Sequence, residues 1–241
     1  MIRVEGVRKS FGAVQAVRDV SFGAADGRIT ALLGPNGAGK STTLRILATV
    51  LQADGGAASV DGHDVAVDPM AVRRRIGVLP HAAGLYARLT ARENVAYFGA
   101  LHGLRGRLLK ERVERLVERL DMGEFADRRV AGFSQGQRIK VALARALVHD
   151  PQNVMLDEPT NGLDVMATRA LREIILGLRD EGRCVLLSSH VMQEIGNLCD
   201  DVVIIGAGRA LFTGSRDDLH RYTGEADLEE AFMRVIGAPT P

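Results

Sequence analysis

Compact runs of apolar residues alternate with segments of helical periodicity along much of this chain. Ile29–Leu33 is the first compact run and is typical of a strand. Three later runs predict further strands, at Val154–Leu156, Cys184–Ser188 and Val202–Ile205. Helices are predicted between them, at Val165–Leu178 and Met192–Cys199. Strands that alternate with helices of this length predict βαβ units and a parallel sheet.

The amino-terminal part has a different pattern. Short strands are expected near Ile2–Val7 and Val20–Phe22, where apolar residues recur between polar ones. Ser59–Val67 predicts another strand, around an Asp61-Gly62 turn. Asp68-Pro69 then predicts an N-cap with proline at the first helical position.

Residues from about 82 to 150 are expected to be mostly helical. Thr90–Glu93 has the sequence of a capping box, and apolar residues recur along one face of Leu108–Leu120. This helical part interrupts the α/β core, so the pattern predicts an inserted helical subdomain.

The carboxyl-terminal part returns to the sheet before it becomes helical. Gly206–Thr213 predicts a hairpin that closes the sheet, and Leu228–Ile236 predicts an amphipathic helix in a short tail at about 215–241. No linker rich in Pro, Gly or Ser divides the chain. We therefore expect one domain over residues 1–241, with subdomains.

Composition narrows the possible classes of function. The chain has 241 residues with 31 Lys and Arg against 30 Asp and Glu, a formal net charge of +1, which argues against a dedicated nucleic-acid binder. No apolar run approaches the roughly 18 residues of a membrane span, and no secretory signal follows Met1. Cys184 and Cys199 fit no metal or redox spacing, so we expect reduced thiols in or near the core of a cytosolic protein. Four histidines without ligand spacing are expected at the surface: His63, His102, His149 and His220.

The segment Gly34-Pro-Asn-Gly-Ala-Gly39-Lys40-Ser41 has the spacing of a phosphate-binding loop. It follows the Ile29–Leu33 strand and precedes a helical pattern over Thr42–Leu51. In such a loop, backbone N–H groups surround phosphate oxygens, and the helix N-terminus adds partial positive charge. We expect Lys40 to face the β- and γ-phosphates and Ser41 to give its hydroxyl oxygen to Mg²⁺. The predicted phosphate-binding residues are Gly34, Asn36, Gly37, Gly39, Lys40, Ser41 and Thr42.

Two carboxylates follow the apolar strand that ends at Leu156. Acids at the carboxyl end of a parallel strand face the crevice where ligands bind. Asp157 suits an outer Mg²⁺ ligand, and Glu158 suits a base that orients or deprotonates the attacking water. His190 ends another apolar strand and is expected at the same sheet edge as Glu158, where it could hydrogen-bond the γ-phosphate or that water.

A second anion site is indicated at Phe133-Ser134-Gln-Gly136-Gln137. Ser134 and Gln137 form a capping box that opens a helix. The segment also presents a serine and the glycine Gly136 at a positive helix end, with no obvious anion of its own.

Together these pieces resemble the ATP-binding subunit of ABC transporters over nearly the whole chain. The matching segments are Gly34–Thr42 (Walker A), Ser134–Gln137 (signature), Val154–Glu158 (Walker B), Asn161–Asp164 (D-loop) and His190 (switch histidine). Phe11 matches the aromatic residue that stacks on adenine. The resemblance implies an α/β fold with a P-loop NTPase (RecA-like) core, a parallel sheet, an antiparallel β subdomain and an inserted α-helical subdomain.

The resemblance also implies how such a subunit works with ATP and Mg²⁺. Lys40, Glu158 and His190 would be catalytic, and Ser41 and Asp157 would hold the metal. Two copies would pair head to tail about a two-fold axis, with the signature helix of each capping the γ-phosphate held by the other. The binding residues on that face would be Ser134, Gly136, Gln137 and Asp164. ATP would close the pair, hydrolysis would reopen it, and a separate integral membrane permease would be switched between states.

Within this family the chain resembles the sodium-export branch and its ABC-2-type relatives. The resemblance rests on Gly84–Asn94, Phe133–Gly136 and Leu228–Phe232. It implies an ABC-2-type permease, export of sodium ions, drugs or antibiotics, and a place in the cytoplasm on the inner face of the cell membrane.

Two positions depart from the family pattern. Gln135 stands where the signature usually has glycine, although Ser134 and Gly136 remain. His81 follows the strand Ile76–Leu79 and Pro80, where the family has the glutamine of the Q-loop, which offers oxygen to Mg²⁺ and senses the membrane partner. Because an imidazole nitrogen is a poor ligand for so hard a cation, we expect His81 to keep the coupling role and to contact the metal at most through water.

Other functions fit the sequence less well. A soluble ABC ATPase in DNA repair would need a long coiled-coil insertion between Lys40 and Ser134, and one acting on ribosomes would need two cassettes and a basic linker. A regulatory module with weak hydrolysis is made conceivable by His81, but the acids and His190 argue against it. A GTPase is excluded by the lack of an Asn-Lys-x-Asp motif.

Overall fold

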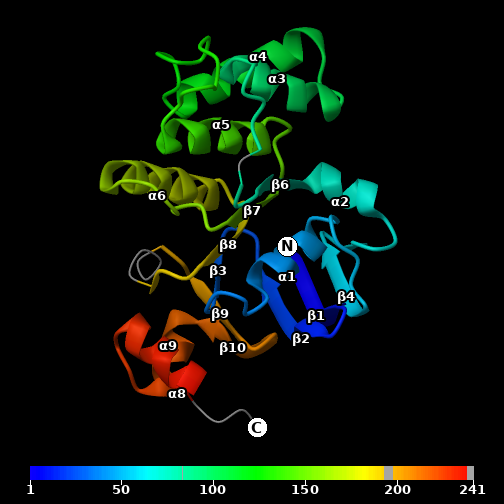
Figure 1. Ribbon diagram of the computed structural model, residues 1–241, viewed down its shortest axis with the longest axis vertical. Helices are drawn as coiled ribbons and strands as arrows, with labels where there is room; N and C mark the ends of the chain where they lie inside the picture. The colour runs from blue at the N-terminus through cyan, green and yellow to red at the C-terminus, as the bar shows by residue number, and fades with distance from the viewer. Residues whose placement is uncertain (83, 193–197, 238–241) are drawn as a thin grey trace.

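A ten-stranded sheet runs through the residues described by the computed structural model, 1–82, 84–192 and 198–237 (Figure 1). The strands are β1 (Ile2–Phe11), β2 (Val14–Ala24), β3 (Ile29–Leu33), β4 (Gly55–Val60), β5 (His63–Asp64), β6 (Ile76–Leu79), β7 (Asn153–Asp157), β8 (Cys184–Ser189), β9 (Asp201–Gly206) and β10 (Arg209–Ser215). The helices are α1 (Lys40–Leu47), α2 (Pro69–Arg75), α3 (Ala91–Leu101), α4 (Gly106–Arg119), α5 (Gln135–Leu147), α6 (Val165–Asp180), α8 (Arg216–Thr223) and α9 (Leu228–Gly237). None of the helices in these ranges is long and apolar enough to span a bilayer.

The strand order is β5-β4-β1-β2-β10-β9-β3-β8-β7-β6. Strands β6, β7, β8, β3 and β9 pair parallel to one another, which confirms the predicted parallel sheet. β1, β2, β4 and β5 pair antiparallel and form the other end of the sheet. The β9–β10 hairpin lies between the two parts, as its position in the strand order shows.

Apolar layers cover both faces of the parallel strands. On β3, Ala31 and Leu33 face one cluster, which includes residues of α3, α4, α5 and α6. Leu32 faces the other, which includes residues of α1, β1 and β2. Successive side chains of a strand point to opposite faces, so a strand covered on both sides reads as a continuous apolar run.

The amino-terminal strands are longer than the sequence indicated, with ten residues in β1 and eleven in β2. Gly6 interrupts the pattern of β1. Its φ of 56° and a register shift between Val4 and Val7 mark an irregularity that the two strands nevertheless span. The predicted Ser59–Val67 strand is in fact part of a hairpin, in which β4, which begins at Gly55, pairs antiparallel with the two-residue strand β5.

The predicted helical region contains three separate helices, α3, α4 and α5, in the upper part of Figure 1. Thr90 and Glu93 cap α3 reciprocally, and Asp68 accepts a hydrogen bond from the Ala71 N–H at the start of α2, as predicted. Residues 120–134 form turns rather than helix, and Phe125 within them is buried against Phe133. The helix predicted over Met192–Cys199 lies largely outside the described residues.

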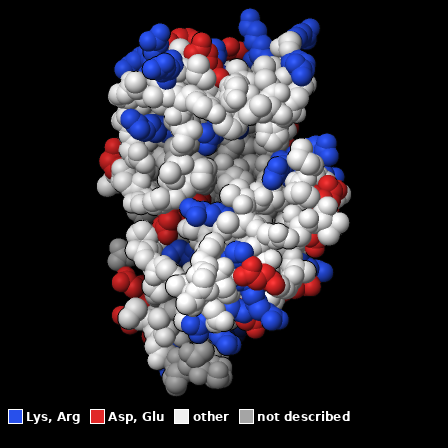
Figure 2. All heavy atoms as spheres, turned by 45° about the vertical axis from the view of Figure 1, so that its right-hand side comes forward, with Lys and Arg blue, Asp and Glu red and all other residues white. Residues whose placement is uncertain are grey.

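A groove of about 730 Å³ separates the helical part from the core. Figure 2 shows a hollow between the upper and lower parts of the molecule that is mostly white, with Lys and Arg near its margins. Its apolar lining comes from α2, β6 and α3, and includes Met70, Val78 and Phe98. Its charged or titratable lining residues are all basic: Arg73, Arg74, His102, Arg145 and His149.

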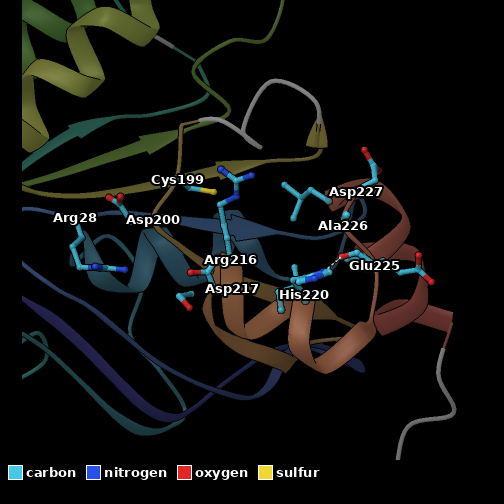
Figure 3. A pocket seen from close by; sticks show the side chains of 13 residues that line it. Arg28, Cys199, Asp200, Arg216, Asp217, His220, Glu225, Ala226 and Asp227 are labelled. Carbon is cyan, nitrogen blue, oxygen red and sulfur yellow. Dashed lines mark hydrogen bonds between the residues drawn. The ribbon is translucent and has the colours of Figure 1, made fainter.

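The helices α8 and α9 pack on β9 and β10 and enclose a second cavity, of about 550 Å³ (Figure 3). Its polar groups mostly serve the fold. Arg28 forms a two-point ion pair with Asp201, with N–O distances of 2.6 and 2.7 Å, and Asp200 accepts the Ile29 N–H. Figure 3 also shows the hydrogen bond between His220 Nδ1 and the Glu225 carbonyl. The first two contacts join the starts of β3 and β9, and the third joins α8 to the turn that follows it.

Both cysteines are buried, as predicted. Burial raises the pKa of Cys184 to about 12 and that of Cys199 to about 11, so both thiols stay protonated at neutral pH.

The predicted surface position of the histidines is wrong for His149, which is half-buried, and His63 is also only partly exposed. The His149 ring stacks on His102 with centroids 3.6 Å apart, and its Nε2–H donates to the Ile76 carbonyl at 2.9 Å. The pKa of His149 is lowered to about 4, mainly by burial and also by the His102 ring. Asp150 and the Ile76 carbonyl act in the opposite direction, while Arg183 adds to the lowering.

The burial of His149 predicts a pH dependence of stability. The folded chain keeps this ring neutral down to about pH 4, whereas the unfolded chain protonates it near pH 6.5. The unfolded state therefore binds more protons in this window, and the free energy of unfolding falls by up to about 3 kcal/mol as the pH drops from 6.5 to 4.

His149→Gln keeps an N–H donor for the Ile76 carbonyl and should remove this part of the slope. Denaturant unfolding at several pH values between these limits measures it. His220→Gln, at an exposed imidazole, is the matched control. Equal slopes for His149→Gln and the unaltered chain would contradict the assignment.

Candidate functional site

The loop between β3 and α1 depends on glycines at two close approaches. A Cβ on Gly34 would lie 2.3 Å from the Ile205 carbonyl oxygen. A Cβ on Gly39 would lie 2.6 Å from the Ala16 carbonyl oxygen, and the φ of 109° at Gly39 is open only to glycine. The loop is therefore held against the backbone of β2 and β9, where a larger residue would displace it.

α1 begins at Lys40 directly after this loop. No side chain caps its N-terminus and its first turn contains no acid, so its N–H groups and dipole are available to an anion. The Lys40 side chain is 5% exposed, and its ammonium makes three polar contacts. It donates to the Gly34 carbonyl at 2.6 Å and the Pro35 carbonyl at 3.3 Å, and it lies 3.5 Å from Glu158 Oε1. A buried cation thus stands over a cradle of backbone donors.

Side-chain oxygen atoms from α1, β7 and β8 meet beside Lys40. The Ser41 hydroxyl donates to Asp157 Oδ1 at 2.9 Å, and the Ser188 hydroxyl donates to the same oxygen at 2.7 Å. A hydroxyl and a carboxylate suit Mg²⁺, which prefers oxygen ligands. No group of three His, Cys, Asp or Glu side chains gathers as a metal site within the described ranges. The residues present therefore fit an ion that takes its remaining ligands from phosphate and water.

Glu158 has an unusual backbone. Its φ is 52°, in the left-handed region that non-glycine residues rarely occupy. Its N–H donates to Ser188 Oγ at 3.0 Å, and its side chain is 10% exposed. Oε2 of the same side chain lies 2.7 Å from His190 Nδ1, whose N–H is the donor. The carboxylate thus lies between the Lys40 ammonium and the His190 imidazole.

One cavity of about 700 Å³ collects most of the predicted site residues. Those that line it are Phe11, Asn36, Gly37, Gly39, Lys40, Ser41, Thr42, His81, Glu158 and His190. Gly34 and Asp157 adjoin it through their contacts with Lys40 and Ser41. The Phe11 ring is 47% exposed at the end of β1, where a planar base could stack on it. This cavity has the components of a nucleotide site: a flat apolar face, a phosphate cradle and a cluster of oxygens.

The other predicted residues lie on a separate surface. Ser134 and Gln137 cap the start of α5 reciprocally, as predicted. Asp164 accepts the Ala167 N–H at 2.8 Å and so caps α6, a role that the sequence did not indicate. A Cβ on Gly136 would lie 3.4 Å from the Ala167 Cβ, which places the starts of α5 and α6 side by side.

Two large apolar side chains stand exposed beside this second surface. Val165 is 83% exposed and Met166 is 74% exposed, both in the first turn of α6. Four residues predicted to bind nucleotide therefore do not line the cavity that holds the P-loop: Ser134, Gly136, Gln137 and Asp164.

The sequence analysis missed Ser188, and it named Asn161 only as part of the D-loop segment. Asn161 lines the nucleotide cavity, and Ser188 lies fully buried between Asp157 and the Glu158 backbone. A serine in the otherwise apolar run of β8 was the available signal, but its partners depend on strand register.

Comparison with known proteins agrees with this geometry. Residues 17–161 match the family model described as ABC transporter. The chain is 45% identical over 92% of its length to the ABC transporter ATP-binding protein NatA of Bacillus subtilis (strain 168), covering 91% of that protein. It is 37% identical over 98% of its length to the daunorubicin resistance ATP-binding protein DrrA3 of Streptomyces coeruleorubidus, covering 74% of that protein.

Two solved structures show the same fold over most of the chain. An ATP-binding subunit of an ABC transporter superposes with a TM-score of 0.89 at 30% identity, covering 98% of this chain and 99% of that one. A dimeric structure of a bacterial ABC transporter cassette superposes with a TM-score of 0.80 at 26% identity, covering 89% of this chain and 98% of that one. The predicted α/β P-loop NTPase architecture is thereby confirmed. With its phosphate cradle, paired acids and matching sequence, this chain belongs to the ABC transporter family and is an ATP-binding ATPase subunit.

Proposed function

We propose that this chain hydrolyses Mg-ATP as a two-fold homodimer and thereby drives export through a separate membrane permease. The observation that carries the proposal is the single cavity in which the Lys40 cradle, the Glu158 carboxylate and the His190 imidazole face one another. The exported substrate in this proposal is sodium, a drug or an antibiotic. A subunit that drives such a permease would lie on the inner face of the cell membrane.

Each residue of the cavity then has a distinct task. Lys40 and the N–H groups of the loop bind the phosphates, and Phe11 stacks on the base. Ser41 and Asp157 hold Mg²⁺, which when bound neutralises charge on the phosphate oxygens. Glu158 orients the attacking water and accepts its proton, and the His190 N–H keeps the carboxylate in position.

The separation between the nucleotide cavity and the surface at Ser134 and Gly136 supports the proposal of a homodimer. The capped helix end at Ser134 and Gly136 presents backbone N–H groups and has no acid in its first turn. In a two-fold pair this end can approach the phosphate held by the other copy, and the exposed Val165 and Met166 would be buried in the contact. Asp164, as the cap of α6, would position that turn rather than bind nucleotide directly.

The groove between the helical part and the core supports the proposal of a permease partner. Its lining is apolar along α2, β6 and α3, and every charged or titratable group in it is Arg or His. An amphipathic segment with acidic residues is complementary to such a surface.

The alternative is a regulatory or non-transport ABC ATPase that acts without a permease. His81 in the nucleotide cavity is the observation that keeps it open, because it replaces the glutamine expected to sense the membrane partner. The experiments below separate the two, since only a transport subunit needs the groove.

Glu158→Gln removes the proposed base but keeps the size and most polar contacts of the side chain. Turnover should fall roughly 100- to 10,000-fold, while ATP binding persists and a nucleotide-bound dimer accumulates. Steady-state ATPase assays and size-exclusion chromatography with Mg-ATP measure the two effects. Glu124→Gln, at an exposed carboxylate outside the cavity, is the control. Hydrolysis at the unaltered rate would remove Glu158 from this role.

His81→Gln and His81→Ala test how this residue meets the metal. Because His81 is expected to reach Mg²⁺ at most through water, the Mg²⁺ concentration for half-maximal turnover should stay within about twofold in His81→Ala. Titration of ATPase activity with Mg²⁺ gives this value. A large increase would show that a direct metal contact had been lost, and the expectation would be wrong.

Arg74→Glu tests the groove. Arg74 is exposed on the groove side of α2, so reversal of its charge should weaken binding to an acidic partner by roughly tenfold and leave the ATPase of the isolated subunit unchanged. Copurification with the permease from membranes at fixed salt measures the effect. Arg3→Glu, on an exposed part of β1, is the control. Equal recovery of the permease with both variants would count against the groove.

A further inference from the structure

Ser188 contacts both acidic residues of the nucleotide site, Asp157 through its side chain and Glu158 through its backbone. It is fully buried on β8, between Asp157 on β7 and Leu32 on β3. Its hydroxyl donates to Asp157 Oδ1 at 2.7 Å and accepts the Glu158 N–H at 3.0 Å. One oxygen atom therefore contacts the side chain of the metal-binding residue and the backbone of the proposed base.

The bond to Glu158 holds a backbone conformation that would otherwise be unfavourable. The left-handed φ of 52° turns the carboxylate toward Lys40 and His190. A residue keeps such a conformation only where its surroundings fix it. The Ser188 oxygen is the hydrogen-bond acceptor for the amide of Glu158. Its loss would leave a part-buried N–H without that partner and release the turn.

The bond to Asp157 acts on the metal side. Asp157 Oδ1 accepts hydroxyl hydrogens from both Ser41 and Ser188. Ser41 itself is a metal-binding residue in the proposed function, so Ser188 is the donor that orients this carboxylate from outside the metal shell. Residues in such positions typically change metal affinity or activity 10- to 100-fold when they are lost.

We propose that Ser188 is a positioning residue for ATP hydrolysis, which fixes the Mg²⁺-binding carboxylate and the catalytic base with a single hydroxyl. The inference rests on the proposed roles of Asp157 and Glu158. It assigns Ser188 no contact with substrate or with the reacting atoms. It requires that removal of the hydroxyl affects both Mg²⁺ binding and turnover, because both carboxylates depend on it.

Thr30 provides a matched control on the neighbouring strand β3. It is fully buried, and its hydroxyl has no hydrogen-bond partner within the described part of the chain. Thr30→Val therefore removes a buried hydroxyl without breaking a contact. Its kcat, nucleotide affinity and melting temperature therefore show the effect of removing a buried hydroxyl that makes no hydrogen bond.

The test compares Ser188→Ala, Ser188→Cys and Thr30→Val in the full chain. Ser188→Cys keeps a side chain of similar shape with a much weaker donor and acceptor. The measurements are kcat and KM for Mg-ATP, the dissociation constant of a fluorescent ATP analogue with Mg²⁺ and with EDTA, and the melting temperature.

Both Ser188 variants should lose roughly 10- to 100-fold in kcat and a comparable part of the Mg²⁺-dependent gain in nucleotide affinity. Nucleotide affinity in EDTA should stay within about twofold, because the phosphate cradle is untouched. Thr30→Val should leave all of these values unchanged. Adding Ser188→Ala to Glu158→Gln should lower the Mg²⁺-dependent gain without a further loss of turnover.

Three results would overturn the proposal. The first is unchanged kcat and Mg²⁺-dependent affinity in Ser188→Ala and Ser188→Cys. The second is an equal loss of both in Thr30→Val. The third is unfolding of both Ser188 variants, which would make the role of Ser188 purely structural. Failure of the proposed function has a different signature. If Glu158 is not the base, Glu158→Gln retains turnover, while the effect of Ser188 on Mg²⁺-dependent binding through Asp157 is still measurable.

Discussion

The register of three adjacent parallel strands determines the nucleotide site. Leu33 of β3 pairs with Ser189 of β8, and Asp157 of β7 pairs with Ser188 of β8. The segments that follow these strands therefore leave the sheet at the same level, and they carry Lys40, Glu158 and His190. A shift of one residue would turn Asp157 to the opposite face of the sheet and separate the oxygen cluster. The apolar layers on both faces prevent such a shift, because they fix which residues of each strand are buried.

The parts of the site that depend on contiguous sequence could be predicted. The loop from Gly34 to Ser41 needs only its own glycines and the flanking strand and helix. The capping boxes at Thr90 and Ser134 are equally local, and both were found as expected. Asp157 and Glu158 were placed because a strand end in a parallel sheet has a known direction.

Contacts between distant segments could not be predicted in the same way. Ser188 is one of two serines at the end of an apolar strand, and only the register shows that it lies beside Asp157. His149 was expected at the surface, yet its ring is covered by His102 from the end of α3. The length of β1 was underestimated because Gly6 breaks its apolar pattern, whereas pairing with β2 carries the strand past that break. In each case the decisive partner is far away along the chain.

The two surfaces proposed to meet in the dimer are connected to the groove through α5. This helix begins at the Ser134 cap, and near its other end Arg145 is buried against the Phe98 ring, 4.5 Å from its centroid. Arg145 also donates to the Gly84 carbonyl at 3.0 Å. β6 runs along the same groove and leads to His81 in the nucleotide cavity.

A partner that displaces the groove lining would therefore act on both functional surfaces at once. Under the proposed function, movement at Arg145 would reach the Ser134 end through α5, because both belong to one helix. Movement of β6 would reach His81 through the backbone that joins them. Under the proposed function, a histidine in place of the family glutamine at residue 81 would change what this segment offers to the metal, while β6 would still connect it to the groove.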